Sequence, residues 1–250
     1  MQHQDIQFEI CGDDKEVAVI RLTRGAKRNA LSDGLILALR NIFEELPSSV
    51  RAAVIDGEGP HFCAGLDLSE LKERDAGQGL HHSRMWHAAL ERVQYGPVPV
   101  VAALHGAVVG GGLELASAAH IRVADASTFY ALPEGTRGIF VGGGGSVRIP
   151  KLIGTARMMD MMLTGRALSA SAARGIGLVD NVVEPWLLLE AAATLALRGT
   201  TRPFKQRALG WITNTFVARK LLAPQMAKQV GLNLALKRVQ ADLAAARNQL

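Results

Sequence analysis

A glycine-rich stretch, residues 99–145, constrains the fold of this chain more than any other segment. The apolar run at residues 98–104 is rich in β-branched side chains and predicts a buried strand. Three consecutive glycines, residues 110–112, then precede residues 113–119, whose composition favours a helix. The sequence therefore predicts a buried strand that leads through a glycine turn into a helix.

Such a turn can hold negative charge. The first N–H groups of a helix have no acceptor within the helix, and the positive end of the helix dipole lies at the same place. Glycine has no Cβ, so a ligand can approach the backbone closely. Tight packing of a helix on a strand explains a glycine cluster equally well, so the turn alone leaves both interpretations open.

Two glutamates lie next to glycine-rich turns. Glu114 follows the three glycines within an otherwise apolar segment, and Glu134 lies in the segment YALPEG. A charged side chain in such surroundings is costly unless it is paired or used. The pattern favours acid/base chemistry on a neutral substrate, and the alternative is a structural ion pair with Arg122 or Arg137.

Two motifs in this order, with the second glutamate behind them, resemble one known superfamily. Residues 61–68 read HFCAGLDL, residues 106–115 read GAVVGGGLEL, and Glu134 follows a proline. Together they resemble the crotonase superfamily, and more closely its enoyl-CoA hydratase/isomerase family. The resemblance implies an α/β fold, a crotonase-like ββα spiral over residues 1–195, with a C-terminal helical trimerisation region over residues 196–250.

The resemblance also implies a reaction, the addition of water across the α,β double bond of an enoyl-CoA thioester. The backbone N–H groups of Leu66 and Gly111 would form the oxyanion hole for the thioester oxygen. Glu114 and Glu134 would hold the water and exchange protons with it. Which carboxylate is the acid and which the base stays open, because two close carboxylates titrate as a pair.

A further set of residues is assigned by resemblance to the binding of substrate and coenzyme A: Lys27, Arg28, Ala30, Ala64, Gly65, Asp67, Leu68 and Gly110. For the two basic residues, a solvated loop is an equal alternative, and Gly25 stands where the family usually has proline. Coenzyme A enters as part of the substrate, and no tightly bound cofactor is expected.

Other activities remain alternatives. An enoyl-CoA isomerase, a decarboxylase, a thioester hydrolase, or a non-catalytic homologue that binds acyl-CoA or RNA could share the anion site. The presence of both glutamates favours the hydratase. Motifs typical of dinucleotide-binding folds, P-loops and serine hydrolases do not occur in the sequence.

Composition adds weaker indications. The chain has 250 residues, 48% of them hydrophobic, which suits one globular core, and its net charge of +5 is weak evidence for a polyanionic partner. We expect neither nucleic acid nor a membrane as a partner. The two cysteines form no framework and favour a reducing, cytoplasmic location. By resemblance, the C-terminal helices would build a homotrimer or a dimer of trimers.

The segment over residues 69–95 carries few apolar residues at first and contains the pair Gly77 and Gly79. It predicts a mobile loop between two helical pieces. His81, His82 and His87 fall here without metal-like spacing, so a metal site is not expected. By resemblance, this region shapes the acyl pocket.

Overall fold

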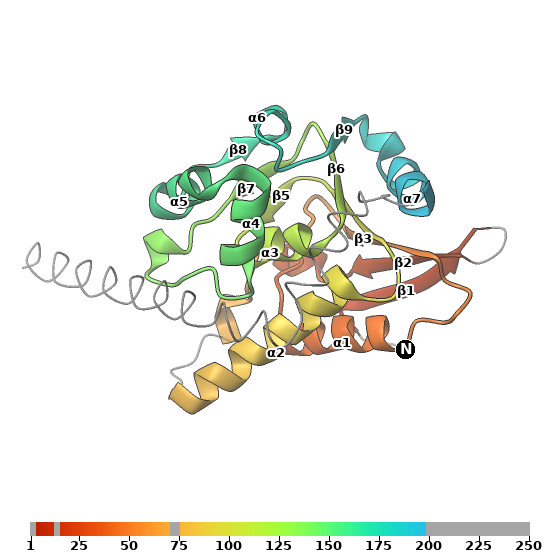
Figure 1. Ribbon diagram of the computed structural model, residues 1–250, viewed down its shortest axis with the longest axis horizontal. Coiled ribbons are helices and arrows are strands. Elements are labelled where there is room, and N and C mark those ends of the chain that lie inside the picture. Colours follow the sequence, from red (N-terminus) through yellow and green to blue (C-terminus); the bar gives the residue numbers. More distant parts are fainter. Residues whose placement is uncertain (1–3, 13–15, 71–75, 199–250) are drawn as a thin grey trace, which may run out of the picture. The chain divides into compact units, whose positions relative to one another are not determined.

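A computed structural model describes residues 4–12, 16–70 and 76–198 (Figure 1). In chain order, its strands and helices are β1 Ile6–Cys11, β2 Val17–Leu22, α1 Asp33–Glu44, β3 Ala52–Gly57, α2 Ala76–Tyr95, β4 Val100–Leu104, β5 Ala107–Val109, α3 Gly111–Ala118, β6 Ile121–Asp125, β7 Phe129–Ala131, α4 Gly145–Ile153, α5 Thr155–Thr164, β8 Leu168–Ser169, α6 Ala170–Gly175, β9 Asn181–Val183 and α7 Leu188–Arg198. Nearly all of the region expected to trimerise, residues 196–250, lies outside the described residues.

The central sheet, as far as the chain is described, has six strands in the order β1-β2-β3-β4-β6-β9. The hairpin of β1 and β2 is antiparallel, and every later neighbour pairs in parallel. Parallel neighbours need crossover connections, and α1 and α2 supply two of them. The strand, helix, strand order of the sequence thus produces the predicted α/β fold. In a smaller described sheet, β7 lies between β5 and β8.

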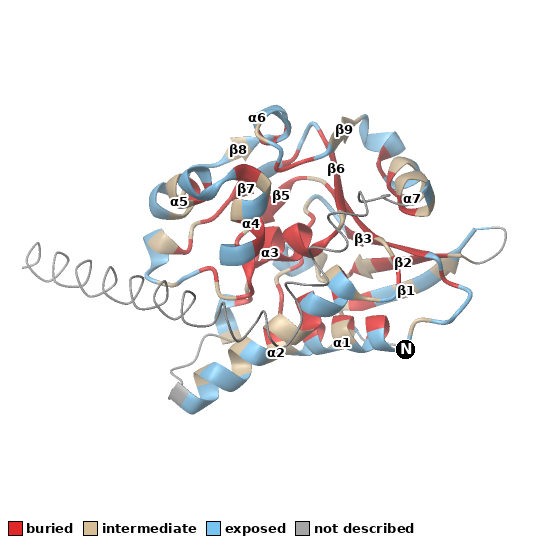
Figure 2. Cartoon of the chain, viewed as in Figure 1, coloured by how far each residue is buried: buried red, intermediate tan, exposed pale blue. Residues whose placement is uncertain are grey.

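The core lies on both faces of the central sheet because side chains alternate along each strand. In β3, Ala53 and Ile55 face the larger core, which α1, α2 and α3 cover. Ala52 and Val54 face the opposite side, where α7 packs. Figure 2 shows that β6 and α3 are buried along their whole length.

The loop predicted at Gly77 and Gly79 is wrong, because both glycines lie in the first turns of one continuous helix, α2. Glycine in a helix costs roughly 1 kcal/mol relative to alanine. Later in α2, Trp86, Leu90 and Val93 are buried at helical spacing, so tertiary packing outweighs that local cost.

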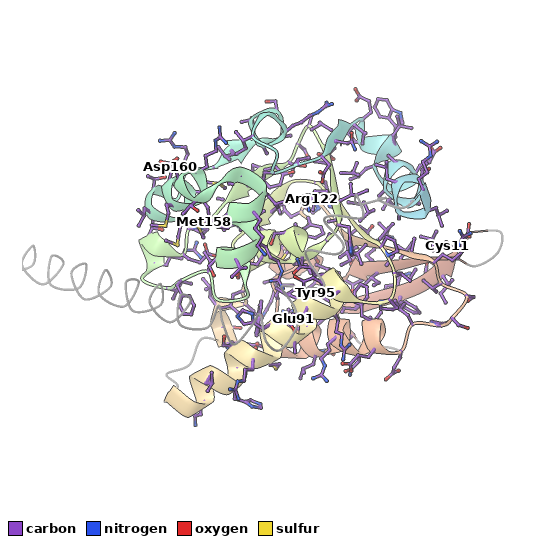
Figure 3. The ribbon with its side chains drawn as sticks, viewed as in Figure 1. Cys11, Glu91, Tyr95, Arg122, Met158 and Asp160 are labelled. Atoms are coloured by element: carbon purple, nitrogen blue, oxygen red, sulfur yellow. The ribbon has the colours of Figure 1, made fainter. Side chains whose placement is uncertain are left out.

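Ser32, with apolar residues at helical spacing behind it, predicts the start of a helix, and α1 confirms this prediction. The Ser32 hydroxyl accepts the N–H of Leu35 at 3.2 Å, which caps α1. The methionine-rich segment forms α5, on which Figure 3 labels Met158 and Asp160. Met158 and Met161 are buried in the larger core. Within the described segments, no helix is long and apolar enough to span a membrane.

Candidate active site

The glycine turn begins the site. After β5, Gly110 has a φ of +53°, a conformation that favours glycine, and its N–H donates to the carbonyl of Ala131 in β7. Gly111 is then the first residue of α3. The predicted strand, turn and helix are confirmed, with the short strand β5 inserted before the turn.

Two backbone N–H groups lie side by side at this turn. A methyl carbon placed on Gly111 would be 3.4 Å from the nitrogen of Leu66. The N–H groups of Ala64 and Asp67 donate to Arg28 and Leu31, but that of Leu66 has no acceptor in the described part of the chain. The N–H of Gly111 has none there either, because it opens a helix. Two neighbouring free donors can bind one oxygen that carries negative charge.

Gly65 makes this approach possible. Its φ is +100°, and a Cβ there would lie 2.8 Å from the carbonyl oxygen of Val109 and 3.3 Å from the nitrogen of Gly111. Its carbonyl accepts the N–H of Leu31 at 2.7 Å, which fixes the peptide that carries the Leu66 nitrogen. A side chain at residue 65 would therefore separate the two donors.

Glu114 is fully enclosed on α3. Its Oε1 accepts the N–H of Gly145 at 2.9 Å, and positions for a Cβ on Gly143 and Gly145 lie within 3.3 Å of its carboxylate oxygens. Burial, assisted by the charge of Glu134, raises the pKa of Glu114 to about 8, although the Gly145 N–H opposes the shift. Near neutral pH this carboxyl can therefore both donate and accept a proton.

Glu134 contacts the turn at Gly110. Its Oε1 lies 2.7 Å from the position that a Cβ on Gly110 would take. Its Oε2 is buried and has no hydrogen-bond partner in the described structure. Burial also raises the pKa of Glu134, with Arg137 opposing the shift. A buried acceptor without a partner is costly, which favours a hydrogen-bonding ligand at this atom.

The alternative of structural ion pairs does not hold for these glutamates in the described residues. Arg122 of β6 instead pairs with Asp180 at 2.6 Å and donates to the carbonyls of Leu178 and Ala119 (Figure 3). Arg137 is exposed and acts on Glu134 only through its charge. Within the described ranges, both carboxylates are therefore free of a direct cationic partner.

The residues expected to bind coenzyme A form a second group beside the turn. Asp67 accepts from Arg24 at 2.7 Å and from Lys27 at 3.0 Å, and its own N–H donates to Leu31. Arg28 is exposed in a left-handed conformation. Lys27 is thus the partner of Asp67, and Asp67 anchors this basic loop to the segment that carries Leu66.

The other members of that group connect the loop to the turn. The carbonyl of Ala30 accepts from Arg24 at 2.6 Å, and Ala64 donates to the carbonyl of Arg28. Leu68 is exposed at the next 3-10 turn, Leu68–Glu70. Hydrogen bonds thus join the loop to the segment over residues 64–68.

Sequence reasoning missed Arg148 and Trp86. Arg148 of α4 is buried and donates to the carbonyl of Gly143 at 2.9 Å. The Trp86 ring lies 3.5 Å from the Cβ position on Gly111, and its indole N–H donates to Asp33. Of the two, only Arg148 had a signal in the sequence, because it closely follows the glycine run at residues 142–145.

No metal-binding group of three or more His, Cys, Asp or Glu side chains occurs among the described residues. His82, one of the three α2 histidines, bonds to Asp33 at 2.7 Å.

Comparison with known proteins places the chain in a family. The enoyl-CoA hydratase/isomerase family model matches residues 12–232, and the chain belongs to that family, within the crotonase superfamily. An alpha subunit of the fatty acid oxidation complex from Shewanella sp. (strain ANA-3) is 40% identical over 233 residues, or 89% of this chain and 33% of that subunit. The chain therefore spans about a third of the length of the curated relatives it matches.

Solved structures give the same class. A Rhodopseudomonas palustris CGA009 protein, described as a candidate enoyl-CoA hydratase, is 47% identical with a TM-score of 0.76, and the match covers 98% of this chain and 97% of that one. The enoyl-CoA hydratase of Bacillus anthracis is 36% identical with a TM-score of 0.72, over 78% and 76% of the two chains. The crotonase-type fold expected from the motifs is confirmed.

Proposed function

We propose that this protein is an enoyl-CoA hydratase that adds water to the α,β double bond of an enoyl-CoA thioester. One observation carries the proposal: at the turn over residues 110–112, two N–H groups have no acceptor in the described structure, Glu134 contacts the turn, and the buried Glu114 follows it on α3. Membership of the enoyl-CoA hydratase/isomerase family supports the substrate class. The choice of a hydratase rests on the pair of glutamates.

The N–H groups of Leu66 and Gly111 would hold the thioester oxygen. When water attacks the β-carbon, electrons move onto this oxygen and an enolate forms. Donors fixed in place beforehand stabilise that charge, and the loss of one typically costs about 10²–10³ in rate. The dipole of α3, which begins at Gly111, favours the same charge.

Glu114 and Glu134 would bind the water between them. One carboxylate takes a proton from the water as its oxygen bonds to the β-carbon, and the other carboxyl gives a proton to the α-carbon. The product is a 3-hydroxyacyl thioester, and the pair as a whole neither gains nor loses a proton. The unpartnered Glu134 Oε2 supports a bound water, and the pKa of Glu114, raised to about 8, supports proton exchange near neutral pH.

Coenzyme A would bind as part of the substrate near the loop of Lys27 and Arg28, with no other cofactor. The exposed Arg28 is the better candidate for a phosphate contact, because Lys27 already neutralises Asp67. A homotrimer or a dimer of trimers remains a prediction, as does a cytoplasmic location. Light scattering on the purified chain would measure the subunit number.

The test is the loss of enoyl-thioester absorbance when the purified protein is added to crotonyl-CoA and to longer, branched and aryl enoyl-CoAs. We expect hydration of at least one member. Glu114→Gln and Glu134→Gln should each lower kcat by orders of magnitude while CoA thioesters still bind. Glu45→Gln, at an exposed position after α1, is the matched control and should keep full activity.

Two outcomes would contradict the proposal. Undiminished turnover in both glutamate variants would remove the carboxylates from the mechanism. Binding without hydration across the panel would assign the anion site to another reaction, and 3-enoyl-CoA, malonyl-type and saturated acyl-CoA thioesters would then separate isomerase, decarboxylase and hydrolase activities.

A further inference from the structure

Arg148 is a buried cation without an acidic partner. It is 7% exposed, and none of the ion pairs within the described residues includes it. Its Nη1 donates to the carbonyl of Gly143 at 2.9 Å and its Nε to Oε1 of Gln94 at 2.7 Å. Both acceptors are neutral. An arginine stays protonated in proteins, so the fold carries the cost of a buried charge that has no direct ion pair among the described residues.

The glycine turn at residues 143–145 lies between this guanidinium and Glu114. Arg148 holds the turn by the carbonyl of Gly143, and the turn gives the N–H of Gly145 to Glu114. A Cβ on Gly144 would lie 2.3 Å from Nη1 of Arg148, so the guanidinium rests directly on the backbone of the turn. Movement of Arg148 would therefore move the donor that orients Glu114.

We propose that Arg148 is a positioning residue for Glu114, because it fixes the glycine turn that binds the carboxyl and places a buried positive charge against that turn. This inference rests on the proposed function for its meaning in catalysis. The geometry on which it is built is independent of the reaction.

The neighbouring charges are consistent with this role. Glu114 experiences the repulsion of Glu134 and the attraction of Arg148. Arg148 experiences Glu114 from α3, and Glu91 and Tyr95 from the last turns of α2, where Figure 3 labels both. Burial and the charge of Arg148 together lower the pKa of the nearby His87, also on α2.

Helix α5 also packs against α4, and its charged groups have other partners. α5 contacts α4, and its Arg157 donates to the carbonyl of Ile153 while its Asp160 pairs with Arg166. On α4 itself, Lys151 is exposed. Among the described groups, Arg148 is thus the cation that acts on Glu114.

The test separates charge from geometry with three variants of the full chain. Arg148→Met removes both, Arg148→Lys keeps the charge but not the planar fork, and Gln94→Met keeps the charge and removes one of the two hydrogen bonds. The titration of Glu114 is followed by NMR on protein labelled with ¹³C-glutamate, and its signal is assigned by its loss in Glu114→Gln.

We expect Arg148→Met to raise the Glu114 midpoint by about half to one pH unit, Arg148→Lys to raise it by clearly less, and Gln94→Met to leave it near the wild-type value. In steady-state hydration, Arg148→Lys should lower kcat about tenfold with KM nearly unchanged, because the turn loses its anchor. If Arg148→Met does not fold, Arg148→Gln, which is neutral and keeps an amide donor for Gly143, replaces it.

An unchanged Glu114 midpoint in a folded Arg148→Met or Arg148→Gln protein would overturn the proposal. An equal shift in Arg148→Lys would also overturn it, because packing rather than charge would then be responsible. A wild-type protein that hydrates no substrate would refute the proposed function. The NMR titration needs no turnover, so it would still test the role of Arg148.

Discussion

Replacement of Glu114 by glutamine should raise the stability of the protein relative to the wild type as the pH rises. In the folded protein, burial raises the pKa of Glu114 from 4.5 to about 8. The folded state therefore binds a proton at Glu114 more tightly than the unfolded state. The contribution of Glu114 to the free energy of unfolding is fully present below pH 4.5 and falls as the pH rises toward 8. Glutamine does not titrate and escapes this loss.

The magnitude follows from the shift. One pKa unit corresponds to about 1.4 kcal/mol, and between pH 4.5 and pH 7 the wild-type protein should lose about 3 kcal/mol of unfolding free energy through this group. The glutamine amide brings its own constant cost, which cancels in the comparison between pH values. The stability difference between Glu114→Gln and wild type should therefore grow by about 3 kcal/mol over that range.

Urea denaturation followed by tryptophan fluorescence, at one protein concentration and at several pH values from 4.5 to 8, measures this difference. Glu45→Gln is the control, because Glu45 is exposed. The stability of this variant should follow that of the wild type across the pH range. Parallel stability curves for wild type and Glu114→Gln would refute the reasoning, since they would mean that Glu114 is not desolvated in the folded protein.

Three further substitutions test the site. Gly111→Ala should fold normally, because the new Cβ makes only contacts of 3.4 Å or longer, and thermal unfolding measures this. The same Cβ crowds the Leu66 N–H, so kcat for hydration should fall about 10²-fold. Gly110→Ala should lose activity and about 1–2 kcal/mol of stability, because its φ is positive and its Cβ meets Glu134, and a stability equal to that of wild type would contradict this. Hydrogen bonds from Ser69, Arg24 and Lys27 hold the pKa of Asp67 well below its usual range. Asp67→Asn should therefore be less stable than the wild type at pH 7, by about 1–3 kcal/mol in urea denaturation, and this difference should close as the pH falls below 3.8. A gap that persists at low pH would assign the loss to packing.

Local sequence signals predicted most of the secondary structure near the site. The buried strand before the glycines and the cap at Ser32 are short-range features, and the structure has both. The prediction failed at Gly77 and Gly79 because helix propensity is local, whereas the packing of Trp86 and Leu90 is not. Lys27 shows the same limit, because its pairing with Asp67 joins residues far apart in the chain.

By itself, the sequence determined the family and the strand and helix around the glycine turn. It also singled out Glu114 and Glu134 as the candidate acid/base residues. Only the tertiary structure decided which groups meet. The pairing of β5 with residue 63 brings the Leu66 N–H beside that of Gly111, and the start of α4 gives the Gly145 N–H to Glu114. The physical reason is that backbone donors carry no residue-specific signal in a sequence, and they become a site only where distant segments fold against each other and leave them without acceptors.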